Sequence, residues 1–148
     1  MSSGPREPGG LLCPSAQPDW EDAFAIGVVG GTPEAPQVGY LERPLPVSDE
    51  LLALAEPALP TEVFRFAAGC VNDACRHNRE GSCRLAAKVV AMLEPVTQRL
   101  PPCTIRGRCR WFQQEGREAC RRCPQVVTDN IFPTPQMRAA ADPEVVLA

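Results

Sequence analysis

The side chains best suited to chemistry in this 148-residue chain are its eight cysteines, because they cluster along the sequence. Four of them lie within the stretch CTIRGRCRWFQQEGREACRRCPQ at residues 103–125, which also holds six arginines. Clustered cysteines are typical of a disulfide framework, a metal site or a redox centre. Their spacing, compartment and neighbours indicate which of the three applies.

The cellular compartment decides whether the thiols stay reduced. The opening stretch MSSGPREPGGLLCPS has no apolar segment of the kind found in a secretory signal. No stretch approaches the roughly 20 apolar residues of a membrane span. We therefore expect a cytoplasmic protein with no membrane partner, in which metal binding is favoured over disulfides. A disulfide scaffold is the alternative for an exported chain.

Seven of the cysteines and the only histidine fall into two candidate ligand sets. The first set has the spacing C-x4-C-x-H-x5-C, and the second has C-x5-C-x10-C-x2-C. Together they could make one site of three cysteines and a histidine and another of four cysteines. The candidate ligands of the metal or cluster are Cys70, Cys75, His77, Cys83, Cys103, Cys109, Cys120 and Cys123.

The eighth cysteine, Cys13, stands apart near the N-terminus, and we expect it to be a free thiol. If the N-terminal segment folds back to supply a ligand, the eight cysteines would instead make two four-thiolate sites. His77 would then be a neighbour of the site, whereas in the first arrangement it is a ligand.

Helix geometry restricts how the second set can be grouped. In one unbroken helix, Cys109 and Cys120 would lie roughly 16 Å apart along the axis, too far to share one zinc ion or one cluster. Either Gly116 breaks the helix, or Cys109 serves a site with the first set. The closest pair, Cys120 and Cys123, is expected to bind one metal.

The residues that flank this closest pair should help the thiols to bind. Pro124 disfavours a helical conformation at Cys123, so we expect that residue to be extended. Arg121 and Arg122 should lower the pKa values of the two neighbouring thiols and favour the ligating thiolates.

The irregular spacings favour an iron–sulfur cluster, expected to be [4Fe–4S], over zinc. Zinc sites usually combine two short C-x2-C knuckles, which this chain lacks. Bacterial ferredoxins end their ligand run in Cys-Pro, as this chain does, although their C-x2-C-x2-C run is missing here. The nearby arginines could offset the negative charge of a thiolate-ligated cluster. Zinc remains the alternative metal.

The stretches PTEVFRFAAGC (60–70) and CRWFQQEGREACRRCPQVVT (109–128) resemble small cysteine-rich bacterial proteins loosely labelled as iron–sulfur or nitrogen-fixation-associated. The resemblance covers about residues 20–130. It implies a compartment and a type of metal, but no reaction mechanism.

The elements that must position these ligands indicate an α+β fold. In AFAIGVV (23–29) bulky and small residues alternate as in a strand, and QVGYL (37–41) can return as its antiparallel partner. Ser48 is placed to cap a short helix that stops at Pro57. Apolar residues in CRLAAKVVAMLEPV (83–96) recur with helical spacing, with Ser82 as a candidate cap.

We therefore predict a small N-terminal β-hairpin and a short helix packed on a helical, cysteine-rich metal-binding core. The expected regions are a flexible Pro/Gly-rich N-terminus at 1–20, the hairpin and short helix at 21–60, the cysteine-rich metal-binding region at 61–128 and a C-terminal tail at 129–148.

The expected function is that of an iron–sulfur protein with a redox, sensory or accessory role and a protein redox or regulatory partner. Enzymatic activity is not favoured, because the chain has a single histidine and no recognisable catalytic set. The alternative is a zinc-stabilised interaction module. Residues 61–125 carry 12 basic and 6 acidic side chains, and this basic surface with Trp111 and Phe112 could bind a protein or nucleic acid.

Overall fold

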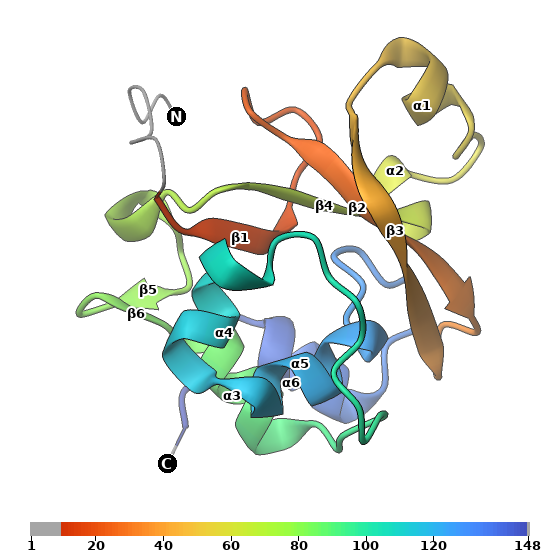
Figure 1. Cartoon of the computed structure of the whole chain (residues 1–148). Coiled ribbons are helices and arrows are strands. Elements are labelled where there is room, and N and C mark those ends of the chain that lie inside the picture. Colours follow the sequence, from red (N-terminus) through yellow and green to blue (C-terminus); the bar gives the residue numbers. More distant parts are fainter. Residues whose placement is uncertain (1–9, 148) are drawn as a thin grey trace.

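A four-stranded antiparallel sheet lies at the centre of the molecule, with the strand order β1-β4-β2-β3 (Figure 1). The computed structural model describes residues 10–147. The strands of the sheet are β1 (Leu12–Ala16), β2 (Phe24–Gly31), β3 (Pro36–Pro46) and β4 (Phe64–Gly69).

The hairpin expected from the alternating pattern is confirmed as β2 and β3. The two strands pair from Gly31 opposite Pro36 back to Phe24 opposite Pro46, with an irregularity between Ala25 and Gly27. Gly27 is required there by close packing, because a Cβ atom on it would lie 2.7 Å from a methyl carbon of Val38. The hairpin thus supplies half of the central sheet.

The central strand β4 is buried along its whole length and separates two apolar layers. Phe64, Phe66 and Ala68 belong to the cluster that contacts the segment after β3. Ala67 belongs to the cluster on the other side, against the helices. Because successive side chains of a strand point to opposite faces, Arg65 lies on the same side as Ala67. A full positive charge is thereby buried between the sheet and the helices.

Short helices cover both faces of this sheet. Helix α1 (Asp49–Ala53) is capped by Ser48, whose Oγ accepts a hydrogen bond from the Leu51 amide at 3.1 Å, as the sequence predicted. In Figure 1, α3 to α6 lie together on the side of the sheet away from α1. The remaining α-helices are α2 (Pro60–Val63), α3 (Arg84–Met92), α4 (Arg110–Glu115), α5 (Arg117–Arg122) and α6 (Pro135–Ala141).

Short elements connect the helices and carry several of the cysteines. They comprise a two-stranded ribbon of β5 (Asn78–Arg79) and β6 (Ser82–Cys83), and three 3-10 helices: η1 (Asn72–Ala74), η2 (Arg106–Arg108) and η3 (Cys123–Gln125). Within residues 10–147, every helix is too short or too polar to cross a bilayer.

The predicted helical, cysteine-rich metal-binding core is wrong. The molecule is built around the four-stranded sheet, and its apolar layers combine strand residues with helix residues. Across residues 10–147, no three His, Cys, Asp or Glu side chains are gathered tightly enough to hold a metal ion. A purely helical core does not form because α4 and α5 have only six residues each. Helices this short would bury too little apolar surface without the sheet.

The N-terminal region also differs from the expectation where the structure describes it. Residues 1–9 lie outside the described residues, but Leu12–Ala16 form the edge strand β1, where we expected a poorly ordered stretch. Pairing with β4 supplies the order, with Leu12 opposite Gly69 and Cys13 opposite Ala68.

Candidate functional site

The eight cysteines are all free thiols, and their surroundings divide them into two sets of four. We call Cys103, Cys109, Cys120 and Cys123 the inner set, because all four line one cavity between the sheet and the helices. We call Cys13, Cys70, Cys75 and Cys83 the outer set, because they are not among the residues that line this cavity.

The cavity of the inner set is almost entirely apolar. Besides the four thiols, its walls include Ile26, Trp111 and Phe112. The free space between these side chains is about 20 Å³, room for about one water molecule. A larger group would therefore require the thiols, or the loop that carries Cys103, to move outward.

The inner set is brought together by a break between two helices. Gly116 ends α4 and begins α5 with φ of 73° and ψ of −155°, a conformation restricted to glycine. Of the two alternatives left open by the sequence, the structure shows the break at Gly116. Because the chain turns there, Cys109 at the start of α4 and Cys120 in α5 face the same cavity.

Cys123 differs from its sequence-based expectation. It is helical, with φ of −54° and ψ of −37°, and it begins η3, where we expected an extended residue before Pro124. The restriction before proline is a bias, and here it is overcome by a tight turn in which the Val126 amide donates to the Cys123 carbonyl at 3.0 Å.

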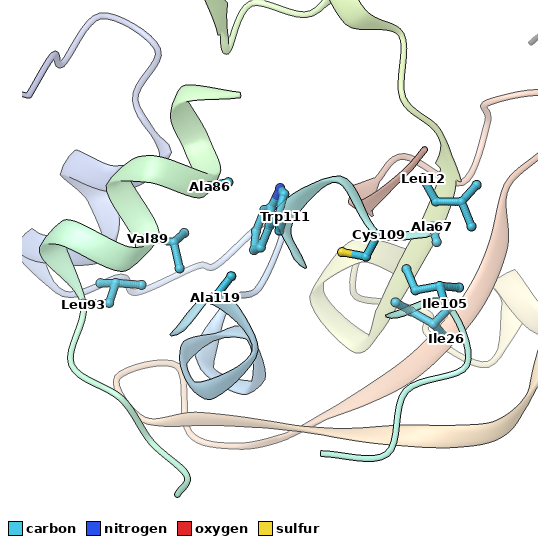
Figure 2. Packing of buried hydrophobic residues seen from close by; sticks show 10 residues of the cluster. All are labelled: Leu12, Ile26, Ala67, Ala86, Val89, Leu93, Ile105, Cys109, Trp111 and Ala119. Atoms are coloured by element: carbon cyan, nitrogen blue, oxygen red, sulfur yellow. The ribbon is translucent and has the colours of Figure 1, made fainter. Parts of the chain in front are cut away.

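Figure 2 shows how Cys109 of the inner set joins the apolar layer on the helical side of the sheet. Trp111 lies between Val89 of α3 and the following Leu93 on one side and Cys109 on the other. Trp111 is only 2% exposed, so its ring holds the helices against the sheet. It is not available at the surface for stacking on a base, as the interaction-module alternative required.

The strongest polar feature beside the cavity is Arg65, which is 0% exposed and contacts the lining residue Cys123. Its Nη2 donates to the Cys123 Sγ at 3.2 Å. The guanidinium carbon also lies over the Trp111 ring, 6.0 Å from the ring centroid. The other hydrogen bonds of the guanidinium go to the backbone carbonyls of Pro14, Cys123 and Val126, at 2.7 to 3.0 Å. None of these acceptors bears a full charge unless the Cys123 thiol is ionised.

A buried guanidinium of this kind calls for a nearby anion. Arginine does not lose its proton in proteins, and an uncompensated buried charge is strongly destabilising. Burial alone would lower the pKa of Arg65, but the negative charge on Cys123, and then on Tyr40, raises it above its ordinary value. The thiols of the inner set are thus the groups that can supply the compensating charge.

Tyr40 places a second polar group in the same cavity. Its hydroxyl is buried and makes no hydrogen bond of acceptable geometry. Burial raises the pKa of Tyr40 far above its ordinary value, and the adjacent Cys123 raises it further. Such an orphaned donor is uncommon in native proteins, and it points toward the thiols of the inner set.

The buried thiols of this set resist ionisation on their own. Burial raises the pKa of Cys103, and it raises the pKa of Cys109 to about 12. The charge of the neighbouring Cys123 adds to both shifts. A bound metal reverses this balance, since a coordinating thiol is deprotonated outright.

The arginines next to Cys120 and Cys123 make contacts within α5 and with the chain after α3. Arg121 and Arg122 both pair with Glu118, at 3.0 and 2.8 Å, and donate to the carbonyls of Thr97 and Leu93. The ion pairs lie within α5, and the hydrogen bonds to the two carbonyls connect α5 to the chain after α3. Sequence reasoning missed Arg65; an arginine inside the otherwise apolar run FRFAAG was the available signal.

The outer set is held by backbone pairing at the left edge of the sheet in Figure 1. The Cys70 amide donates to the Leu11 carbonyl at 2.9 Å, which fixes the end of β4 beside the start of β1. Burial raises the pKa of Cys13 to about 12, and the charges of Cys83, Cys70 and Cys75 raise it as well. Cys13 is a free thiol, as expected, but it lies in the ordered strand β1.

His77 lies beside the outer set without a polar contact from its ring nitrogen Nδ1, which is buried and unpartnered. Its backbone amide donates to the Cys75 Sγ at 3.4 Å. Burial lowers the pKa of His77, so the imidazole is held in its neutral form more than a free histidine would be. Its role as a ligand stays a prediction.

The arrangement of the thiols bears on the choice between zinc and a cluster. Four sulfurs around one zinc ion lie about 3.8 Å from one another, given Zn–S bonds of about 2.3 Å in a tetrahedron. No three candidate ligands within the described part of the chain are arranged around a single ion. In a [4Fe–4S] cluster each cysteine binds a different iron, so the thiols stand further apart. Four cysteine thiols are the donor set that such a cluster requires.

Comparison of the chain with protein-family models, with curated proteins and with solved structures gave no match. The resemblance to small cysteine-rich bacterial proteins therefore stays a prediction from the sequence.

Proposed function

We propose that this protein binds an iron–sulfur cluster through the inner set and that it has a redox, sensory or accessory role. The observation that carries the proposal is the contact between the buried Arg65 guanidinium and the Cys123 sulfur. A thiolate-ligated cluster carries net negative charge, and N–H donors to its sulfurs are among the features that tune its reduction potential. The cavity therefore combines four ligands with a fixed counter-charge.

The cluster would be held by Cys103, Cys109, Cys120 and Cys123, and it would supply one-electron chemistry. The chain itself contributes the rest of the site. Arg65 balances the negative charge, the Tyr40 hydroxyl offers a hydrogen bond, and the apolar walls formed by Ile26 and Trp111 exclude water. Solvent exclusion and buried donors are two features through which proteins adjust such centres.

The alternative, a zinc-stabilised interaction module, is weakened by one observation. Trp111 is buried, so it is not part of an exposed binding surface. A protein redox or regulatory partner remains part of the proposal, and binding of nucleic acid through the basic middle region remains part of the alternative.

The first test is anaerobic purification followed by absorption spectroscopy and assays for iron, zinc and sulfide. We expect a brown protein with broad visible absorption that changes reversibly on reduction with dithionite. Cys120→Ser and Cys123→Ser should each lose the iron of the inner set. A colourless protein with zinc and no sulfide would contradict the proposal and favour the interaction module.

The role of Arg65 is tested with two substitutions and a matched control. Arg65→Gln removes the charge, so we expect it to lose most of the iron of the inner set, whereas Arg65→Lys should retain more because it keeps the cation. Arg43→Gln removes an exposed arginine from the same sheet and should bind iron as the unmodified protein does. Equal iron loss in the Lys and Gln variants would indicate a purely structural role for Arg65.

A further inference from the structure

We infer that the outer set, completed by Cys13, is a second four-thiolate site that binds a second iron–sulfur cluster. The ligand class rests on the proposed function of the inner set, but the site itself is built from different elements. Its four cysteines come from β1, the residue after β4, the residue after η1, and β6.

Strand pairing fixes the first two ligands relative to each other. Cys13 lies opposite Ala68 in the register of β1 and β4, two residues before Cys70. The Cys70 amide continues this pairing by donating to the Leu11 carbonyl. Both residues are therefore held by the edge of a buried sheet, so the geometry of this half of the site does not depend on a flexible terminus.

The β5–β6 ribbon joins the other two ligands. The Asn78 amide donates to the Cys75 carbonyl at 3.1 Å, and Asn78 pairs with Cys83 across the ribbon. Cys83 also begins α3, where its Sγ accepts a hydrogen bond from the Ala86 amide at 3.5 Å. This sulfur takes the capping position that the sequence assigned to Ser82. Cys75 and Cys83 thus lie at the base of one small ribbon.

Helix α4 connects the two halves of the outer set. At its start, Cys109 forms a parallel bridge with Leu12, next to Cys13. Further along, the Gln114 side chain accepts from the Cys83 amide at 2.8 Å and donates to the Cys83 carbonyl at 2.9 Å. One helix therefore contacts both the strand that carries Cys13 and the ribbon that carries Cys83.

Arg110 of α4 gives the outer set a counterpart to Arg65. It is largely buried, and its Nη1 lies 3.6 Å from the Cys70 Sγ and 3.0 Å from the Asn72 Oδ1. Its Nη2 donates to the Gly81 carbonyl at 2.5 Å. The guanidinium thus spans from Cys70 to the ribbon, and the acceptor that can become anionic is again a thiol. Each set of four thiols therefore has one buried arginine in contact with one of its sulfurs.

The two sites are neighbours in space. Cys13 belongs to the outer set, while the next residue, Pro14, lines the inner cavity and accepts from Arg65. Cys109 belongs to the inner set, while the next residue, Arg110, contacts the outer set. One peptide bond therefore separates the two sets at Cys13–Pro14 and again at Cys109–Arg110.

The test compares serine variants that each remove one ligand from one set. Wild-type protein and variants are reconstituted without air, using ferrous iron and sulfide, and are assayed for iron, sulfide and the electron paramagnetic resonance of the reduced state. With [4Fe–4S] in both sites, we expect about eight irons per wild-type chain and about four each for Cys13→Ser and Cys123→Ser. The combined variant should bind almost none.

Controls keep a folding defect apart from the loss of a ligand. Ser15→Ala removes a side-chain hydrogen bond to Thr128 from the same strand, so it should lower the melting temperature without lowering the iron content. Cys70→Ser removes another ligand of the outer set, at a half-buried position. If Cys13→Ser folds poorly, Cys70→Ser should still show the same loss of iron.

Four outcomes would overturn the inference. Full iron content in Cys13→Ser and Cys70→Ser would show that the outer set binds no cluster. Loss of all iron in Cys123→Ser would show that a single site is filled. Zinc in the outer set with iron in the inner set would contradict only the second cluster, whereas absence of iron from the wild-type protein would contradict the proposed function as well.

Discussion

Arg65 and Tyr40 place two different polar groups against one thiol. The guanidinium of Arg65 is fully hydrogen-bonded, but its buried positive charge still requires a compensating negative charge. The hydroxyl of Tyr40 is uncharged, but it lacks a hydrogen-bond acceptor. A neutral Cys123 thiol satisfies neither well, whereas a cluster with thiolate and sulfide sulfurs would satisfy both.

The orphaned hydroxyl leads to a prediction with opposite signs in the two forms of the protein. In the apoprotein, Tyr40→Phe removes a buried group without a partner, so we expect the free energy of unfolding to rise by about 1 kcal/mol. In the iron-loaded protein the same change removes a donor, so iron should be lost faster to a chelator. Thermal melting of the apoprotein and the rate of bleaching with a chelator measure the two effects.

A stability change of the same sign in both forms would argue against a hydrogen bond from Tyr40 to the bound group. Gln37→Ala serves as a control, because Gln37 lies on the same strand but is exposed. It should change neither the melting temperature nor the rate of bleaching by a measurable amount.

At the scale of elements, the inner set depends on the turn at Gly116. Open space surrounds the position of a Cβ atom there, so the cost of Gly116→Ala is conformational and not steric. We expect a loss of stability of about 1–3 kcal/mol, since the backbone angles suit only glycine. Because α4 and α5 carry Cys109 and Cys120, the inner set should also lose iron.

Gly107→Ala is the matched control for this turn. Gly107 likewise has open space around its Cβ position, but its φ is not positive. The alanine should be tolerated, with unchanged iron content. If Gly107→Ala and Gly116→Ala had equal effects in thermal melting and iron assays, the special conformation of Gly116 would not matter to the site.

Local signals in the sequence predicted the β2–β3 hairpin and the Ser48 cap, and they offered the break at Gly116 as one of two alternatives. Each of these depends on residues close together in the chain. The strand β4 was not predicted, because it is buried on both faces and lacks an alternating pattern. The grouping of Cys13 with Cys70 was also missed, since it depends on pairing between β1 and β4, which are far apart in the sequence.

At the scale of the whole molecule, much of the positive charge of the middle region is used internally. Arg65 and Arg110 are buried against thiols and carbonyls, and Arg121 and Arg122 pair with Glu118. The excess of basic over acidic residues in 61–125 therefore overstates the charge available to a nucleic acid. It suits the two proposed sites, each of which would collect negative charge.

The molecule also divides into a half that contains the thiols and a half that does not. The cluster of Phe64, Phe66 and Leu51 holds α1 against one face of the sheet and includes no cysteine. The cluster on the other face includes Cys109 and packs against Cys83, Cys103 and Cys123. The segment 93–105, between α3 and η2, has no helix or strand of its own. Its position depends on the residues around the inner set.

This division predicts how the protein responds to removal of its metal. Hydrogen exchange of the apoprotein should lose protection at residues 70–83 and 93–123, because ligand binding and local folding are coupled there. Strands β2 and β4 should stay protected, since the cysteine-free cluster and the sheet pairing remain. Exchange measured before and after chelation, followed by mass spectrometry, separates the two regions. Equal protection of residues 93–123 in both forms would contradict a structural role for the bound group, and loss of protection in β2 and β4 as well would show that the sheet cannot persist without it.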